Sequence, residues 1–297
     1  GIIPRVVSEI FTTISESNED LEFRLKVSMY EIYMEKVIDL LDTRKGDLKV
    51  REDKKGFFVQ DLTETYVASE LEILQMLEIA NSHKSMGSTN MNLSSSRSHT
   101  IVMITISQTN LVLNTGRTGK LFLVDLAGSE KVEKTKAEGK ALGEAKKINQ
   151  SLTWLGKVIN ALTEVSIKHV PYRNSKLTCV LKESLGGNSN TSLIITCSPS
   201  SFNDSETLST LRFGERAKNV KNQPKVNKEV TVPELLSKIE RLKEIIVKKE
   251  RRECVLLETL NANGISIPSC IEIPDFNAIE EQSTANISDS SLAIESQ

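Results

Sequence analysis

One short loop of this chain has residue types that could hold a metal ion beside a phosphate group. The apolar run 121–124 ends in Asp125-Leu126-Ala127-Gly128-Ser129-Glu130. A carboxylate at the tip of a buried strand can reach Mg²⁺ through water, and Gly128 lets a backbone N–H approach a phosphate without a side chain in the way. The pattern D-x-x-G is common, so alone it indicates only a strand followed by a turn.

A second loop lies shortly before it in the chain, at Asn92-Leu93-Ser94-Ser95-Ser96-Arg97-Ser98-His99. Serine hydroxyls can ligate Mg²⁺ or orient a water molecule, and Arg97 can pair with a carboxylate through two parallel hydrogen bonds. The same residues also fit a serine-rich surface loop with a solvated arginine.

Hydrophobic periodicity predicts the elements that position these loops. The chain alternates strands and helices, which is typical of a layered α/β domain. We expect strands at 23–33, 100–108, 120–125 and 191–197, a turn at 114–119, and helices at 4–15, 70–81, 141–163, 174–185 and 205–220, the last with Ser205 as N-cap. The apolar stripe of helix 141–163 consists of Ile148, Leu152, Leu155, Ile159 and Leu162, with Lys146, Gln150, Trp154 and Lys157 on the other side.

The pattern changes after residue 220. Residues 221–232 are polar with one proline and predict a linker, and residues 233–260 predict a helix. Leu235, Ile239, Leu242 and Ile246 have coiled-coil spacing, but Lys249 and Glu253 occupy the next positions of the same seam, so the run is short. Residues 261–297 are rich in serine and acids without periodicity, which predicts disorder.

Composition sets further limits. The 297 residues are 38% apolar and 26% charged, as in a soluble globular protein, and no apolar run approaches the ~20 residues of a membrane helix. The four cysteines and three histidines are scattered, which argues against a metal or disulfide framework and favours a reducing compartment. Residues 131–190 contain eleven Lys and Arg against five Asp and Glu. This excess fits either an acidic partner or a solvated helical face.

Taken together, the two loops resemble switch I and switch II of the kinesin motor domain, and the resemblance covers roughly residues 1–232. It implies a three-layer α/β kinesin-type motor domain, a mostly β central sheet flanked by helices, over 1–220, a neck linker at 221–232, a neck helix at 233–260 and a tail at 261–297. The linker is most similar to that of conventional kinesin heavy chains, which move towards microtubule plus ends. The other matching segments are Lys131–Gly139, Ile148–Gly156, Val170–Thr178, Leu185–Asn188 and Ser205–Lys218.

The resemblance assigns roles in ATP hydrolysis. It implies that Ser95 and Ser96 contact Mg²⁺, phosphate or the attacking water, and that Asp125 holds Mg²⁺ through water. Gly128 would sense the terminal phosphate. Arg97 and Glu130 would close the site as a salt bridge, with Glu130 helping to accept a proton and Asn149 supporting the water network.

The phosphate cradle of that family, G-x-x-x-x-G-K-[ST], does not occur in the 297 residues. From the resemblance we expect the chain to begin just after this P-loop, with the first strands of the sheet also absent. The parent protein would then be a microtubule-stimulated ATPase, while these residues alone would neither bind ATP tightly nor hydrolyse it.

The resemblance also names the acidic partner as the microtubule. The implied contacts are basic or aromatic residues: Arg51, Lys54, Lys131, Lys146, Lys147, Lys157, Tyr172, Arg173 and Lys176. Cys179 and Gln150 stand where conventional kinesins carry Arg and often Lys, and Trp154 replaces a small residue and is expected to pack against a neighbouring element.

We therefore expect a cytoplasmic protein of the microtubule cytoskeleton. A homodimer could form through 233–260, and neither nucleic acid nor membrane insertion is expected. One alternative is a non-motor microtubule-binding protein of kinesin type without ATPase activity. A GTPase-like switch would share D-x-x-G. This chain, however, has no Asn-Lys-x-Asp guanine reader, and a GTPase would not explain Ser-Ser-Arg-Ser-His.

Overall fold

The computed structural model describes residues 1–54, 56–88, 97–113, 115–129, 140–164, 169–229 and 232–264. The chain divides into two compact units, Gly1–Glu229 and Val230–Gln297. The second unit contains one long helix, α6 (Val232–Ala262). The functional loops predicted from the sequence belong to the first unit.

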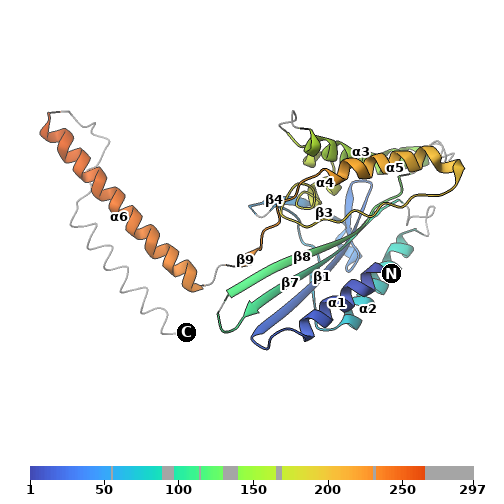
Figure 1. The fold of residues 1–297 in the computed structure, drawn as a ribbon, viewed down its shortest axis with the longest axis horizontal. Coiled ribbons are helices and arrows are strands. Elements are labelled where there is room, and N and C mark those ends of the chain that lie inside the picture. Colours follow the sequence, from blue (N-terminus) through green and yellow to red (C-terminus); the bar gives the residue numbers. More distant parts are fainter. Residues whose placement is uncertain are drawn as a thin grey trace. The chain divides into compact units, whose positions relative to one another are not determined.

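A strongly twisted antiparallel sheet forms the centre of the first unit (Figure 1). Its long strands are rich in β-branched and aromatic residues, and the strand order is β3-β2-β1-β7-β8-β9, with β6 also paired to β1. The strands are β1 (Leu21–Tyr33), β2 (Lys36–Asp39), β3 (Asp47–Leu48), β6 (Thr65–Val67), β7 (His99–Asn110), β8 (Thr115–Asp125) and β9 (Lys228–Glu229). A separate hairpin consists of β4 (Val50–Asp53) and β5 (Gly56–Val59).

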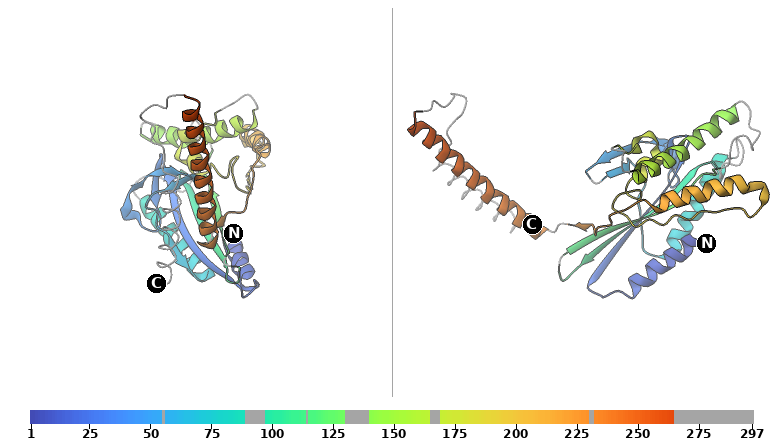
Figure 2. Two further views of the ribbon diagram at one scale, coloured as in Figure 1. Left: turned by 90° about the vertical axis from the view of Figure 1, so that its left-hand side faces the viewer. Right: turned by 45° about the horizontal axis from the view of Figure 1, so that its top comes forward.

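Helices cover both faces of this sheet, so the unit has three layers (Figures 1 and 2). On one face α1 (Ile2–Ser15) and α2 (Glu70–Ser88) bury Val7 and Ile73 against Val27 and Ile104 of the sheet. On the other face lie α3 (Lys140–Thr163), α4 (Lys176–Val180) and α5 (Asp204–Lys218). Their core residues include Leu155, Ile159 and Leu177, which pack with Tyr30 and Ile101.

Most sequence-predicted elements are present. The helices expected at 4–15, 70–81, 141–163, 205–220 and 233–260 correspond to α1, α2, α3, α5 and α6, and the strands at 23–33, 100–108 and 120–125 to β1, β7 and β8. The turn expected at 114–119 lies earlier, because β8 already begins at Thr115. The helix expected at 174–185 is regular only as α4, and α5 begins at Asp204 with Asn203 as its N-cap, so Ser205 is not the cap.

The buried strand expected at 191–197 is wrong. This segment is irregular, and the side chains of Leu193 and Ile194 are 45% and 69% exposed. A strand needs a neighbour to pair its backbone N–H and C=O groups, and no strand of the described residues lies beside this segment. Its apolar sequence alone therefore does not produce strand structure here.

A two-residue turn couples the sheet to α4. Met34 and Glu35 both have positive φ, as a tight β1–β2 hairpin requires. The Glu35 carboxylate accepts hydrogen bonds from Ser175 Oγ (2.7 Å) and Lys176 N (2.8 Å). It thereby holds the first turn of α4 at a fixed place on the sheet.

Candidate functional site

The pairing of β7 with β8 brings the described ends of the two predicted loops, residues 97–99 and 126–129, to one end of the sheet. The strands are antiparallel, and Thr100 is the Cα partner of Asp125. The residues just before β7 and those just after β8 therefore lie at the same end of the sheet. Arg97, partly buried, and Gly128 are both located there.

A buried histidine joins this end of the sheet to α3. His99, the first residue of β7, accepts a hydrogen bond at Nδ1 from Ala127 N (2.9 Å), and its Nε2 is 2.6 Å from Ser151 Oγ. Because Nδ1 accepts, the neutral ring carries its proton on Nε2 and donates it to Ser151. Burial lowers the pKa of His99 from 6.5 to about 4, which keeps the ring neutral.

The described part of the chain includes four of the seven residues expected to act on the nucleotide: Arg97, Asp125, Gly128 and Asn149. Asn149 is partly exposed on α3, two residues before Ser151. Ser95, Ser96 and Glu130 lie outside the described residues, as does the predicted Arg97–Glu130 salt bridge. The structure therefore brings together the backbones that carry Arg97, Asp125 and Gly128.

The site fits Mg²⁺ in the form in which proteins usually hold this ion. Mg²⁺ retains several waters and is bound by one or two carboxylates together with substrate phosphates. Asp125 is exposed at the end of β8, so its carboxylate can face a hydrated ion. The described residues contain no group of three or more His, Cys, Asp or Glu side chains that would form a protein-only metal cage.

Besides Arg97, a second basic side chain that the sequence did not reveal, Lys84, lies at this end of the sheet. Lys84 Nζ of α2 donates a hydrogen bond to Thr100 Oγ1 (2.6 Å). Thr100 and Asp125 are cross-strand partners, so their side chains project from the same face of the sheet. The expected helix ended at residue 81, whereas α2 continues to Ser88, so the periodic pattern did not point to Lys84.

Five of the predicted microtubule contacts lie in α4 or in segments packed against it, and we call this set the basic face: Arg51, Lys54, Lys157, Arg173 and Lys176. Arg51 and Lys54 come from the β4–β5 hairpin, which packs against α4, and Lys157 is exposed on α3, which also contacts α4. Lys131 lies outside the described residues, and only the backbones of Lys146 and Lys147, in α3, are described.

Ion pairs hold part of the basic face in place. Arg173 and Lys182 both contact the carboxylate of Glu52 on β4, at 2.5 and 3.0 Å. Hydrogen bonds from Arg173 and then Lys182 lower the pKa of Glu52. Lys176 pairs with Asp47 at 2.9 Å. Glu52 thereby ties the hairpin to the residues on either side of α4, and Asp47 ties α4 to β3, roles that the sequence did not reveal for Arg173 and Lys176.

Two aromatic residues contribute to packing. Tyr172 is half-buried, and its hydroxyl donates to Leu185 O (2.5 Å), so it braces the chain after α4. Trp154 is partly buried and stacks under the ammonium of Lys157, 4.0 Å from the ring centre.

Cys179 is buried, and burial raises the pKa of its thiol to about 11, so this position presents no charge.

The polar segment after α5 is attached to the first unit. The side chain of Asn222 donates to Ser189 O (2.9 Å) and accepts from Gly186 N (2.7 Å). Further along, Thr118 N donates to Asn227 O (3.0 Å), and β9 pairs with the start of β8. Of the predicted linker, Asn222 is thus bound to the loop after α4, and residues 227–229 lie along the β8 edge of the sheet.

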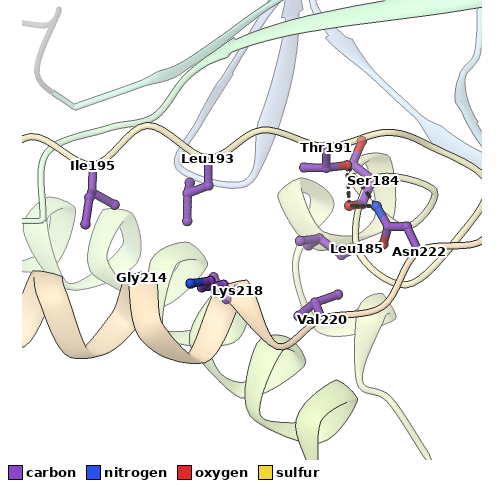
Figure 3. A pocket seen from close by; sticks show the side chains of 10 residues that line it. Ser184, Leu185, Thr191, Leu193, Ile195, Gly214, Lys218, Val220 and Asn222 are labelled. Carbon is purple, nitrogen blue, oxygen red and sulfur yellow. Dashed lines mark hydrogen bonds between the residues drawn. The ribbon is translucent and has the colours of Figure 1, made fainter.

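A cavity of about 430 Å³ lies where this segment meets α5 and the irregular run 191–195 (Figure 3). Its walls are mainly apolar and include Leu185, Leu193, Ile195 and Val220. At Gly214 of α5 a Cβ would come within 2.9 Å of Ile195 Cδ1, so glycine permits this close approach. None of the sequence-predicted site residues lines the cavity.

Architecture and site together define a three-layer α/β domain in which β7 and β8 bring Arg97 and Gly128 to one end of the central sheet. A solved structure of a fast kinesin superposes with a TM-score of 0.73 at 55% identity, covering 78% of this chain and 66% of that chain. A second match is a KIF14 dimer in the two-heads-bound state, with AMP-PNP and in complex with a microtubule. Its TM-score is 0.72 at 39% identity, covering 78% of this chain and 68% of that chain.

Sequence comparison agrees with the fold. The family model described as the kinesin motor domain matches residues 1–220, and the chain therefore belongs to the kinesin motor domain family. Kinesin heavy chain of Syncephalastrum racemosum is 56% identical over 260 residues, covering 87% of this chain and 27% of the relative. The chain spans about a quarter of the length of such curated relatives.

Proposed function

We propose that this chain is the switch and track-binding part of a plus-end-directed kinesin that couples ATP hydrolysis to movement along microtubules. The observation that carries the proposal is structural: Ala127 of one loop is hydrogen-bonded through His99 to α3, and α3 carries Lys157 of the basic face. A change in the loop is thereby connected to the surface that would meet the track.

ATP and Mg²⁺ are the proposed ligands of the two loops. Asp125 would hold Mg²⁺ through water, Gly128 would offer its backbone N–H to the terminal phosphate, and Arg97 would close the site with Glu130. Ser95 and Ser96 would contact Mg²⁺, the phosphate or the attacking water, and Asn149 would support the water network. Phosphoryl transfer depends mainly on such positioning and charge stabilisation.

Microtubules are the proposed partner of the basic face. The KIF14 relative is described in complex with a microtubule, and tubulin presents an acidic surface that a cluster of Lys and Arg would attract. We also propose a cytoplasmic, microtubule-associated location and a homodimer through α6, whose Leu235, Ile239, Leu242 and Ile246 are all exposed. Among the described residues no helix is long and apolar enough to cross a membrane.

The lack of G-x-x-x-x-G-K-[ST] in the 297 residues favours one alternative, a non-motor microtubule-binding protein of kinesin type without ATPase activity. Both proposals expect these residues to bind microtubules without releasing phosphate, so the observation that separates them is whether the coding DNA upstream of Gly1 encodes G-x-x-x-x-G-K-[ST] in frame. An in-frame P-loop there would contradict the alternative, and measurable microtubule-stimulated turnover by these residues alone would show that another segment replaces the P-loop.

Co-sedimentation with microtubules tests the track-binding proposal. The double change Arg51→Glu and Lys157→Glu should weaken binding about tenfold, because each reversal replaces attraction by repulsion. Arg5→Glu is the matched control for either reversal made singly, since Arg5 is exposed on α1, in the layer on the other face of the sheet. Equal weakening by the control would mean that binding depends on net charge and does not involve this face.

A further inference from the structure

We propose that His99 is a positioning residue that makes the loop after β8 and helix α3 move as one body, so that the state of the loop is passed to the basic face. The inference rests on the proposed function for its biological meaning, and on the contacts of one imidazole for its physical basis. No predicted role fell on His99 or on Ser151.

The three residues joined by these hydrogen bonds are buried. His99 and Ser151 are 2% and 3% exposed, and Ala127 is 5% exposed. The hydrogen bonds between them are therefore shielded from water. If one of them breaks, a bond to solvent cannot replace it. Separating the loop from α3 would break the bond that Ala127 N makes with His99 or the bond that His99 makes with Ser151, each in a buried place.

The backbone of His99 is anchored in the sheet. The Cα partner of His99 on β1 is Ile32, at the end of a long ladder between β1 and β7. The imidazole thus projects from the most extensively paired strand of the sheet. The next residue of β7 facing the same side, Ile101, is fully buried in the core that α3 also joins through Leu155. A ring held in this way cannot follow the loop without disturbing α3.

The imidazole ring of His99 uses both of its nitrogens. Imidazole offers an acceptor and a donor on opposite sides of one rigid plane, and here Nδ1 serves the loop while Nε2 serves the helix. Asparagine could mimic only the Nδ1 acceptor. Glutamine could mimic only the Nε2 donor. Either substitution separates the two connections that histidine combines.

The test measures coupling inside the free chain of 297 residues, by amide hydrogen exchange at Ala127. Ser151→Ala does not touch Ala127, yet it should speed this exchange about tenfold, the effect of losing roughly one hydrogen bond of positioning. Ser28→Ala is the matched control, because Ser28 is 1% exposed on β1 and equally buried. It should leave the exchange at Ala127 within about twofold.

A double-mutant cycle separates coupling from general destabilisation. In a His99→Asn background, which keeps only the acceptor for Ala127, Ser151→Ala should have no further effect on Ala127 exchange. In the unsubstituted chain, ¹⁵N NMR of His99 should show a protonated Nε2 and an unprotonated Nδ1 at neutral pH. If His99→Asn does not fold, the ring spectrum and the Ser151→Ala result still decide.

The outcomes distinguish this inference from the proposed function. Unchanged Ala127 exchange in Ser151→Ala, additive effects in the cycle, or a ring protonated on Nδ1 would overturn the positioning role even if the chain binds microtubules. Coupled exchange in a chain that does not bind microtubules would keep the positioning role and contradict the proposed function.

Discussion

The buried imidazole of His99 predicts a specific dependence of stability on pH. Its folded pKa is about 4 against an ordinary value of 6.5, because burial disfavours the charged ring. The folded state therefore binds fewer protons than the unfolded state between these values. The contribution of His99 to the free energy of unfolding is complete above pH 6.5, falls as the pH drops, and levels off below the folded pKa.

The magnitude follows from the two pKa values. At a pH of about 5 the unfolded imidazole is almost fully protonated and the folded one almost entirely neutral, so His99 alone removes about 2 kcal/mol of stability relative to neutral pH. The complete shift corresponds to about 3 kcal/mol. In comparison, a domain of this kind has a total stability of only about 5–15 kcal/mol.

Urea unfolding at a series of pH values measures this effect. Other groups also titrate, so the informative quantity is the difference between the wild-type chain and His99→Asn, which cannot ionise. We expect the variant to be less stable at neutral pH and the gap to shrink by about 2 kcal/mol by a pH of about 5. A constant gap across the series would refute the neutral, buried state of His99.

Three further results are expected. Asp39→Ala should lower the free energy of unfolding by about 3 kcal/mol, because the fully buried carboxylate accepts three backbone N–H groups; urea unfolding measures this, and a loss below about 1 kcal/mol would contradict it. Glu52→Gln should raise proteolytic cleavage within the β4–β5 hairpin, since both Arg173 and Lys182 lose their ionic partner, and cleavage at the wild-type rate would argue against this tether. Leu242→Glu should convert a dimer into a monomer in sedimentation equilibrium, whereas Lys243→Glu, next to it on α6, should not. A monomeric wild-type chain would exclude the proposed α6 dimer.

The sequence was sufficient for the parts of the site that depend on local pattern. Two β-rich runs joined by a short connection predict a hairpin, and a hairpin necessarily brings the residues before its first strand close to those after its second. The proximity of Arg97 and Asp125 follows from this alone. The helix stripe through Leu155 and Ile159 was also predicted, because its period of 3.6 needs no knowledge of the partner.

Other features depend on contacts between distant segments and had no local signal. The role of His99 arises only when Ala127 and Ser151 meet at one ring. The ion pairs of Arg173 and Lys176 join residues more than a hundred positions apart. The apolar run 191–197 was expected as a strand from composition, but strand structure depends on a neighbouring strand, which a sequence pattern does not specify.

Cross-linking on microtubules tests whether the basic face is the track-binding surface. A zero-length reagent that joins lysine amines to carboxylates would be applied to the chain bound to microtubules, and the linked peptides would be identified by mass spectrometry. We expect links to tubulin from Lys54 and Lys157, which are both exposed. Links formed only by lysines outside the basic face would contradict this expectation.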